Sequence, residues 1–374
     1  KNTNIKISKD YKTWNDYTSG TEIELNPKDR VYIKSDYVLD ESATPKFNFT
    51  NANGTRLRAR GNIASLLYGT GDEYITKYTI ATQYCYNSMF DNCTSLTQAP
   101  DLPATTLADH CYYAMFSNCT SLTQTPELPA VTLADYCYRS MFNGCAGLAQ
   151  APELPATTLA DYCYDSMFQH CTSLTQAPNL PATTLTQSCY IMMFRGCTGL
   201  TQTPELPATT LAKNCYDSMF ANCTSLTRTP ELPAAILVDY CYDSMFSGCT
   251  SLNQSPELPA TTLAYGCYSY MFEGCTGLTQ APELPATTLA DYCYYSMFSG
   301  CVKINYVKCL ATDTSANNCT KDWLNNVSAT GTFECDNKKY FTVDSPNGIP
   351  TGWTITEINP DVEKPDLDTF DPNV

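Results

Sequence analysis

Cysteine is the residue with the clearest chemical potential in this chain, and it recurs at a fixed spacing. A first cysteine returns every 26 residues and a second follows eight residues later, so that 18 of the 21 cysteines form nine pairs. The first members are Cys85, Cys111, Cys137, Cys163, Cys189, Cys215, Cys241, Cys267 and Cys293, and the second members run from Cys93 to Cys301. Such pairs could bind zinc, form disulfides or pack as thiols.

The spacing argues against a metal site and leaves the other two states open. A zinc site uses close pairs of ligands in short loops, whereas eight residues of predicted helix separate the two sulfurs by about 12 Å. Stacked helices would hold neighbouring copies about 8–10 Å apart, beyond the roughly 7 Å between Cα atoms that a disulfide tolerates. We therefore favour reduced cysteines packed as small apolar side chains, and cross-pairing between adjacent repeats is the remaining disulfide geometry.

No other group of residues forms a recognisable catalytic arrangement. The two histidines, His110 and His170, occupy different repeat positions and have no evident serine or cysteine partner in the sequence. A Gly-x-Ser-x-Gly elbow, a phosphate-binding glycine loop and a His-Glu-x-x-His motif are all absent. We therefore expect a protein that is not an enzyme and uses no cofactor.

The element that positions the cysteines is the 26-residue repeat itself, which predicts a solenoid of stacked turns with one continuous core. Cys85, Met89, Cys93 and Leu96 fall on one stripe of a helix. An aspartate two residues before the first cysteine in most copies could cap that helix, and the Gly, Asn or His before the second cysteine could end it in a left-handed conformation. A short strand at Thr-Ser-Leu-Thr-Gln follows. The sequence predicts an α/β repeat solenoid, a right-handed stack of the leucine-rich-repeat type with one short strand and one short helix in each of nine repeats.

The two ends differ from the repeats, as the ends of an open solenoid must. We predict a β-rich N-terminal cap at 1–80, the solenoid at 81–310, an irregular C-terminal cap at 311–358 and an acidic, extended or mobile tail at 359–374. The strands expected in the N-terminal cap are residues 21–25, 30–38 and 46–50. Towards the C-terminus we expect strands at 302–309, 330–333, 340–343 and 352–355, and a helical turn at 322–327.

The charge and the hydropathy of the chain restrict the classes of partner that we expect. The net charge is −16, and residues 85–301 alone carry 4 basic and 17 acidic side chains. Such a body repels a phosphate backbone, so we expect neither nucleic acid nor anionic membranes as partners. The sequence contains no run of about 18 apolar residues, so we expect no transmembrane segment. The chain opens at Lys1 without an apolar signal core, which suggests a trimmed form whose export signal or lipid anchor is absent, and we expect a monomer.

Two further columns of residues recur. Carboxylates stand at one repeat position in seven copies, namely Asp101, Glu127, Glu153, Glu205, Glu231, Glu257 and Glu283. A row of calcium sites is conceivable, but prolines flank each acid where calcium-binding solenoids have glycine-rich turns, so a solvated ridge is the preferred interpretation. The tyrosine after each first cysteine, from Tyr86 to Tyr294, is invariant, which indicates packing with the hydroxyl reaching solvent or backbone.

A few positions vary on this constant scaffold and are therefore not fixed by the core. They lie two and three residues after the first cysteine and just after the phenylalanine. If partners contact this side of the stack, the candidate binding residues are Tyr113, Arg139, Asp165, Ile191, Met192, Arg195, Asp217, Tyr270, Glu273 and Tyr295.

The spacing and the Met-Phe-x-x-Cys-x-x-Leu core resemble the BspA-like leucine-rich-repeat proteins found on the surface of gut and oral anaerobic bacteria. Matching positions are held by Phe168, Cys171, Leu174 and Pro178. Cys163, Tyr164 and Met167 depart from the family pattern, which has Ile, Gly and Ala there, and the family unit is about three residues shorter. The resemblance covers about 220 residues and implies an exported, cell-surface protein used in adhesion or host contact.

The sequence thus leaves two functions open. The first is a non-catalytic cell-surface adhesion protein that recognises a protein or glycan of a host or neighbouring cell through an extended solenoid face. The alternative is a structural spacer or envelope scaffold that displays a terminal module, for which near-identical repeats suffice.

Overall fold

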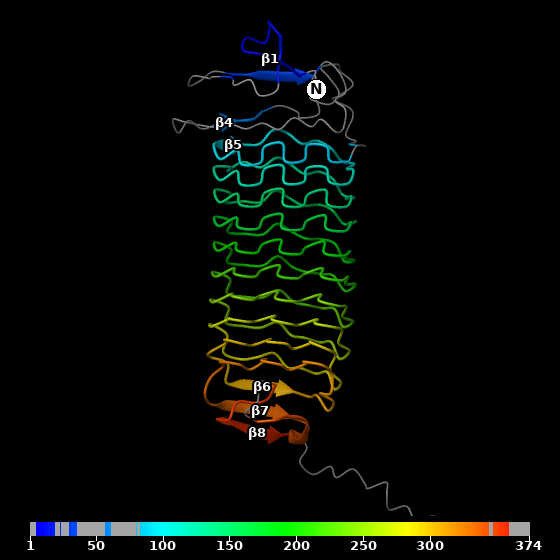
Figure 1. Ribbon diagram of the computed structural model, residues 1–374, viewed down its shortest axis with the longest axis vertical. Coiled ribbons are helices and arrows are strands. Elements are labelled where there is room, and N and C mark those ends of the chain that lie inside the picture. Colours follow the sequence, from blue (N-terminus) through cyan, green and yellow to red (C-terminus); the bar gives the residue numbers. More distant parts are fainter. Residues whose placement is uncertain are drawn as a thin grey trace, which may run out of the picture.

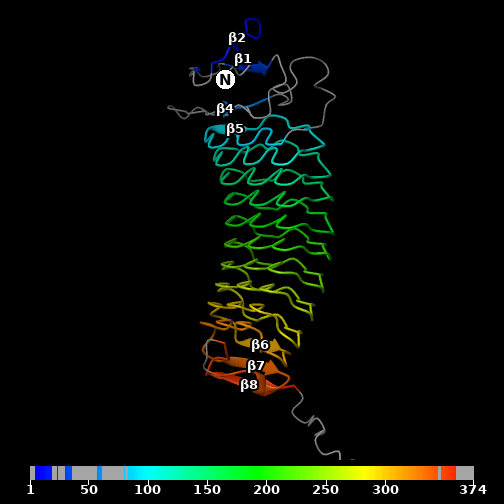
Figure 2. The same ribbon diagram turned by 45° about the vertical axis from the view of Figure 1, so that its right-hand side comes forward.

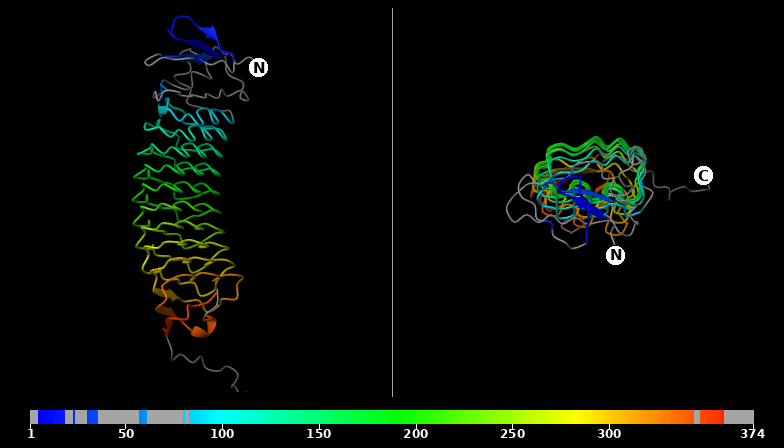
Figure 3. Two further views of the ribbon diagram at one scale, coloured as in Figure 1. Left: turned by 60° about the vertical axis from the view of Figure 1, so that its left-hand side comes forward. Right: turned by 90° about the horizontal axis from the view of Figure 1, so that it is seen from above.

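The computed structural model describes residues 5–18, 23, 30–35, 57–60, 80, 83–343 and 347–358. The repeats form a tall stack of coils, one coil for each 26-residue unit, with β1 at one end and β6 to β8 at the other (Figure 1). Seen along the stack, successive coils overlie one another as a flattened ring (Figure 3). The predicted solenoid of stacked repeats is confirmed.

The predicted helix between the two cysteines is wrong. We call the residues from two before the first cysteine to the second cysteine the cysteine segment, for example 161–171. Its alternate amides donate to carbonyls of the next coil at 2.8–3.0 Å, the donors being Tyr162, Tyr164, Ser166, Phe168 and His170. The intervening amides donate three residues back within the coil at 3.0–3.3 Å. Among the described residues the single helical element is the short 3₁₀ helix η3 (Lys338–Tyr340).

The close spacing of the coils explains why no helix forms. Phenylalanine rings of adjacent coils stack with centroids 5.4–5.8 Å apart along the whole ladder. Neighbouring helices need about 8–10 Å, and a helix would also keep within itself the amide hydrogen bonds that here join the coils. Tyr162, Ser166 and His170 have φ of 56°, 54° and 60°, which a right-handed helix does not allow.

The predicted stop signal holds, although it ends a series of turns instead of a helix. The residue before the second cysteine has φ between 57° and 76° in every coil, at Asn92, Asn118, Gly144, His170, Gly196, Asn222, Gly248, Gly274 and Gly300. The predicted aspartate cap is wrong. Asp135 Oδ1 accepts the amide of Asp161, and Asp161 Oδ1 accepts the amide of Gln187, both at 3.0 Å. These carboxylates therefore cap the following coil instead of their own.

The strand predicted after the second cysteine is shorter than expected. In the first coil it is β5 (Leu96–Gln98), parallel to β4 (Leu57–Arg58). In later coils isolated parallel bridges replace it, such as that between Gln176 and Gln202. The prolines that follow cannot donate to a ladder and end the pairing at once.

At the N-terminal end β1 (Ile5–Ser8) lies between β2 (Asn15–Asp16) and β3 (Tyr32–Ser35), antiparallel to both. Strand β3 lies within the predicted strand 30–38. The predicted strand 46–50 lies outside the described residues, as does 21–25 apart from residue 23. The extent of the predicted cap, 1–80, stays a prediction.

At the C-terminal end β6 (Tyr306–Cys309), β7 (Gly331–Cys335) and β8 (Trp353–Glu357) form a parallel sheet below the last coil (Figure 2). They overlap the strands predicted at 302–309, 330–333 and 352–355. The strand predicted at 340–343 is wrong, because η3 occupies its start and Val343 makes only one bridge, to Ile349. Residues 322–327 form turns that resemble a cysteine segment, and the predicted helical turn is absent there.

The core consists of ladders of identical side chains. The invariant tyrosines are 1–2% exposed, so their predicted packing is correct. The hydroxyls of Tyr138, Tyr190 and Tyr242 are buried without a hydrogen-bond partner in the described part of the chain, so in these three the hydroxyl reaches neither solvent nor backbone. Burial raises the pKa of these phenols well above the usual value.

All 21 cysteines are buried free thiols. The second cysteine of each coil after the first donates its thiol to the phenylalanine carbonyl of the preceding coil at 2.9–3.1 Å, as Cys197 does to Phe168. The coils lie closer together than helices would. The helical spacing from which we argued against disulfides between adjacent repeats was therefore wrong. The thiols connect neighbouring coils through hydrogen bonds.

Candidate functional site

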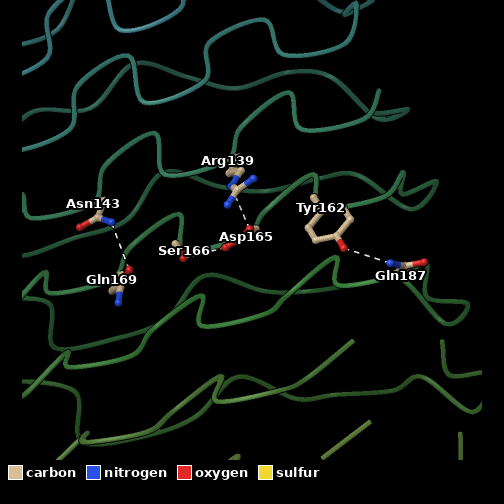
Figure 4. Close-up of polar contacts among 7 residues, drawn as sticks. All are labelled: Arg139, Asn143, Tyr162, Asp165, Ser166, Gln169 and Gln187. Carbon is tan, nitrogen blue, oxygen red and sulfur yellow. Dashed lines mark hydrogen bonds and ion pairs between the residues drawn. The ribbon is translucent and has the colours of Figure 1, made fainter. Parts of the chain in front are cut away.

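The cysteine segments form one long wall of the solenoid. The positions on the side away from the core, which we call the variable wall, are held in the fourth coil by Asp161, Tyr162, Asp165, Ser166 and Gln169, of which Asp165 and Ser166 are themselves buried. Figure 4 shows the last four of these side chains. In this coil they are hydrogen-bonded to their neighbours, for example Gln169 Oε1, which accepts from Asn143 Nδ2 at 3.1 Å. Because the backbone of every coil has the same path, residues at equivalent positions form columns along the stack.

One ion pair dominates the N-terminal half of this wall. Arg139 Nε lies 2.9 Å from Asp165 Oδ2, and Ser166 Oγ donates to the other carboxylate oxygen at 2.6 Å (Figure 4). Burial raises the pKa of Asp165, while the Ser166 hydrogen bond and the Arg139 charge oppose that rise. Asp165 is only 5% exposed, so its carboxylate is already engaged inside the protein.

Aromatic rings surround this arginine. The guanidinium carbon lies 5.6–6.0 Å from the ring centres of Tyr113, Tyr136 and Tyr162, within the range of cation–π attraction. Tyr84, His110, Tyr136 and Tyr162 form a continuous stack with centroid distances of 4.4, 4.5 and 4.7 Å. We call these five aromatic residues with Arg139 the N-terminal tyrosine cluster.

A second aromatic group lies three repeats further along the variable wall. Tyr240, Tyr265, Tyr270, Tyr292 and Tyr295 form this C-terminal tyrosine cluster, with successive centroids 5.1–5.6 Å apart. Tyr265 is 37% exposed and the other four are half-buried. Gly266 has φ of 56°, and a Cβ there would lie 2.8 Å from the Tyr240 ring, so that a larger residue would displace this ring.

Two carboxylates, Asp243 and Glu273, lie beside the C-terminal tyrosine cluster, and Asp217 acts on Asp243 from the preceding coil. Burial raises the pKa of Asp217, Asp243 and Glu273, and that of Asp243 reaches about 7 because Asp217 and Glu273 add their charges to the effect of burial. Ser244 Oγ donates to Asp243 at 2.7 Å. Within the described residues none of the three carboxylates makes an ion pair, in contrast to Asp165.

The candidate binding residues from the sequence thus fall into three places. Tyr113, Arg139 and Asp165 belong to the N-terminal tyrosine cluster or its ion pair. Tyr270, Tyr295 and Glu273 lie in or beside the C-terminal one. The remaining four, Ile191, Met192, Arg195 and Asp217, lie between them and are partly exposed, with Arg195 Nη1 3.7 Å from Met192 Sδ.

Sequence reasoning missed the column just before the first cysteine. This column supplies Tyr84, His110, Tyr136, Tyr162, Tyr240 and Tyr292, and Tyr265 lies one position earlier. The signal was available, because the position alternates between aromatic residues and Ser188, Asn214 or Gly266. A position that tolerates both tyrosine and glycine is not core.

Of the other residues considered for chemistry, the recurring carboxylates and His170 are not part of these clusters, whereas His110 is. The seven recurring carboxylates from Asp101 to Glu283, which we call the acidic ladder, are all exposed, and Lys308 Nζ lies 3.2 Å from Glu283. His170 is exposed and lies against Gly196, whereas His110 is part of the aromatic stack. In the described ranges no three His, Cys, Asp or Glu side chains are placed so that they could hold a metal ion.

Asp243 gives a pH-dependent prediction. Because its pKa is about 7 in the folded chain, above the usual value of 3.8, the folded state binds more protons between these values, and its stability falls as pH rises through that window. Asp243→Asn removes the buried charge and should raise the melting temperature at pH 8 but not at pH 4. Thermal melts of both proteins across this range, with exposed Glu257→Gln as the control, test this, and a pH-independent difference would contradict it.

These features define a repeat solenoid with a variable outer wall. The family model for the BspA type leucine rich repeat region, in six copies, matches residues 72–201 and 161–305, more than half of the chain. The chain belongs to this family. A leucine-rich repeat protein from Bacteroides ovatus ATCC 8483 whose crystal structure is solved matches with 19% identity and a TM-score of 0.39, over 87% of this chain and 91% of that chain. No curated protein matches.

Family membership suggests a protein-binding role, and such repeat regions are typically non-catalytic and surface-associated. In the part of the chain that the structure describes, no helix has the length and hydropathy needed to cross a bilayer.

Proposed function

We propose that this chain is a non-catalytic adhesion protein of a cell surface that recognises a protein or glycan of a host or neighbouring cell through the variable wall. One observation carries the proposal: the inward positions are almost constant from coil to coil, whereas Arg139, Asp165, Ile191 and Asp217 occupy one outward position in successive coils. A wall whose side chains change while its backbone stays constant suits recognition of an extended partner.

Affinity on such a wall is spread over several coils, so the proposal predicts a graded response to coil number. The purified chain would be tested for binding to panels of matrix proteins and mucin-type glycans by surface plasmon resonance. In-frame deletion of the four repeats from residue 163 to residue 266 should weaken binding to any ligand found, while deletion of one repeat should weaken it less. Circular dichroism and thermal melts would verify that the shortened solenoids are folded.

The spacer alternative rests on the uninterrupted core, which joins the coils into one elongated stack. It predicts the opposite result: repeat deletion would shorten the molecule, as measured by small-angle X-ray scattering, without changing any interaction. Saturable binding that is unaffected by both deletions would assign recognition to the terminal segments and reject the proposed use of the wall.

A further inference from the structure

In the N-terminal tyrosine cluster, an arginine of the chain itself occupies a site made of tyrosine rings and a carboxylate. Arg139 lies against three tyrosine rings at 5.6–6.0 Å and pairs with the buried carboxylate of Asp165 at 2.9 Å. A guanidinium is a good occupant for such a place, because it stacks on aromatic faces and is more weakly hydrated than an ammonium group. The same wall therefore contains a complete, internally filled cation site.

The C-terminal tyrosine cluster has the same components without the central cation. Its five tyrosines lie in contact, and burial, the Tyr295 hydroxyl and the charges of Glu273 and Asp243 all raise the pKa of Tyr270. The column that supplies Arg139 holds Asp243, Ser269 and Tyr295 in this region. Among the described cations, Lys213 Nζ lies 6.0 Å from the Tyr240 ring centre and Lys321 Nζ lies 5.7 Å from that of Tyr295, at the two ends of the cluster. Arg195 acts on Asp217 and lowers its pKa.

We infer that the C-terminal tyrosine cluster is a docking site for an arginine-bearing segment of a partner protein, with the guanidinium groups against Tyr265 and Tyr292 and paired with Asp243 and Glu273. This inference rests on the proposed function and specifies the chemistry of its partner. An arriving guanidinium replaces the missing counterpart of Arg139. It would also offset the charges of Asp217 and Glu273, which together with burial raise the pKa of Asp243.

Charge favours a cationic peptide over a neutral glycan. Residues 85–301 carry 17 acidic and 4 basic side chains, and Asp239 and Asp291 precede Tyr240 and Tyr292 in the chain. This field attracts cations over the whole wall and accelerates their encounter at low salt. Sugar rings also stack on tyrosine, but a neutral sugar would leave the half-buried carboxylates without a counter-charge.

The direct test uses the full chain and a fluorescein-labelled peptide of alternating arginine and glycine, with binding measured by fluorescence anisotropy at low and physiological ionic strength. We expect saturable binding that salt weakens. The double variant Tyr265→Ser/Tyr292→Ser should weaken it by about tenfold, and Glu273→Gln by about threefold, in line with one lost ring pair or one lost charge. The alternating glutamate–glycine peptide should not bind.

Two controls separate this site from general acidity. Glu257→Gln removes one exposed charge on the acidic ladder, away from the tyrosines, and Tyr84→Ser removes an exposed ring of the N-terminal tyrosine cluster, where Arg139 already occupies the site. Both should leave the affinity within about twofold. Absence of saturable binding at low salt, or equal binding by the tyrosine double variant, would overturn the inference.

A neutral oligosaccharide that binds the native chain and not the double variant, while the arginine peptide fails to bind, would assign the cluster to a glycan instead. That outcome would reject the cationic partner and still support recognition through the variable wall. Failure of the proposed function itself is detected separately, by repeat deletions that leave ligand binding unchanged.

Discussion

Replacing Phe194 by alanine should lower the free energy of unfolding by about 3–5 kcal/mol. The Phe194 side chain is 0% exposed and stacks between the rings of Phe168 and Phe220, each with centroids 5.6 Å away. Loss of the ring leaves a cavity that the neighbouring coils cannot close, because their spacing is fixed by amide hydrogen bonds on both sides. Chemical denaturation followed by circular dichroism measures this change.

The matched control is Ile236→Ala, in the same stack but with the isoleucine 76% exposed, and its effect should stay within about 0.5 kcal/mol. In a solenoid each coil contacts only its neighbours. The Phe194 variant could therefore unfold in two steps, in which the coils on one side of residue 194 unfold before those on the other side. Equal stability of the two variants would contradict the ladder of rings as the main stabilising contact.

The thiols of the central coils should react with iodoacetamide at least about a thousandfold more slowly in the folded chain than in the unfolded chain. Burial raises the pKa of Cys197 from 9.0 to about 12, and the thiolate is the reactive form. The pKa change alone lowers the thiolate population at pH 8 by about that factor, and burial of the sulfur blocks the reagent as well. Mass spectrometry of native and guanidinium-unfolded protein measures the rates residue by residue.

A new thiol at an exposed position of the same coil, Thr198→Cys, supplies the positive control and should react at the rate of a free peptide. Rapid labelling of Cys197 in the native chain would show that the coils open easily. An intact mass lower by two hydrogens for each pair of cysteines would instead show disulfides and contradict the free thiols.

The apolar pattern predicted which side chains are buried but not which hydrogen bonds their backbone makes. Cys163, Met167 and Cys171 lie on one side of the segment in both a helix and the observed ring of turns, and all three are 0% exposed. The decision between the two depends on the amide partner of every second residue, such as Tyr164 and Phe168, which lies 25 positions away in the next coil. No local pattern contains that information.

Local conformation was more predictable than long-range pairing. The Gly, Asn or His before each second cysteine indicated a left-handed residue, and all nine are left-handed. Asp161 was assigned to the wrong donor because a carboxylate at this position can reach either its own segment or the next coil, and the close stacking favours the latter. At the candidate site, variation identified Tyr113, Arg139 and Tyr295, whereas Tyr265 and Tyr292 became evident once the columns were seen side by side.

The alternate amides of the cysteine segment give this wall of the stack a net dipole along its long axis. From residue 136 to residue 300, every backbone-to-backbone hydrogen bond that joins these segments has its donor in the earlier coil and its acceptor in the later one. Aligned peptide dipoles add, as they do in a helix, so this wall ends in amide hydrogens towards the C-terminus and in carbonyl oxygens towards the N-terminus. Two such molecules that meet end to end have complementary partial charges only in head-to-tail order.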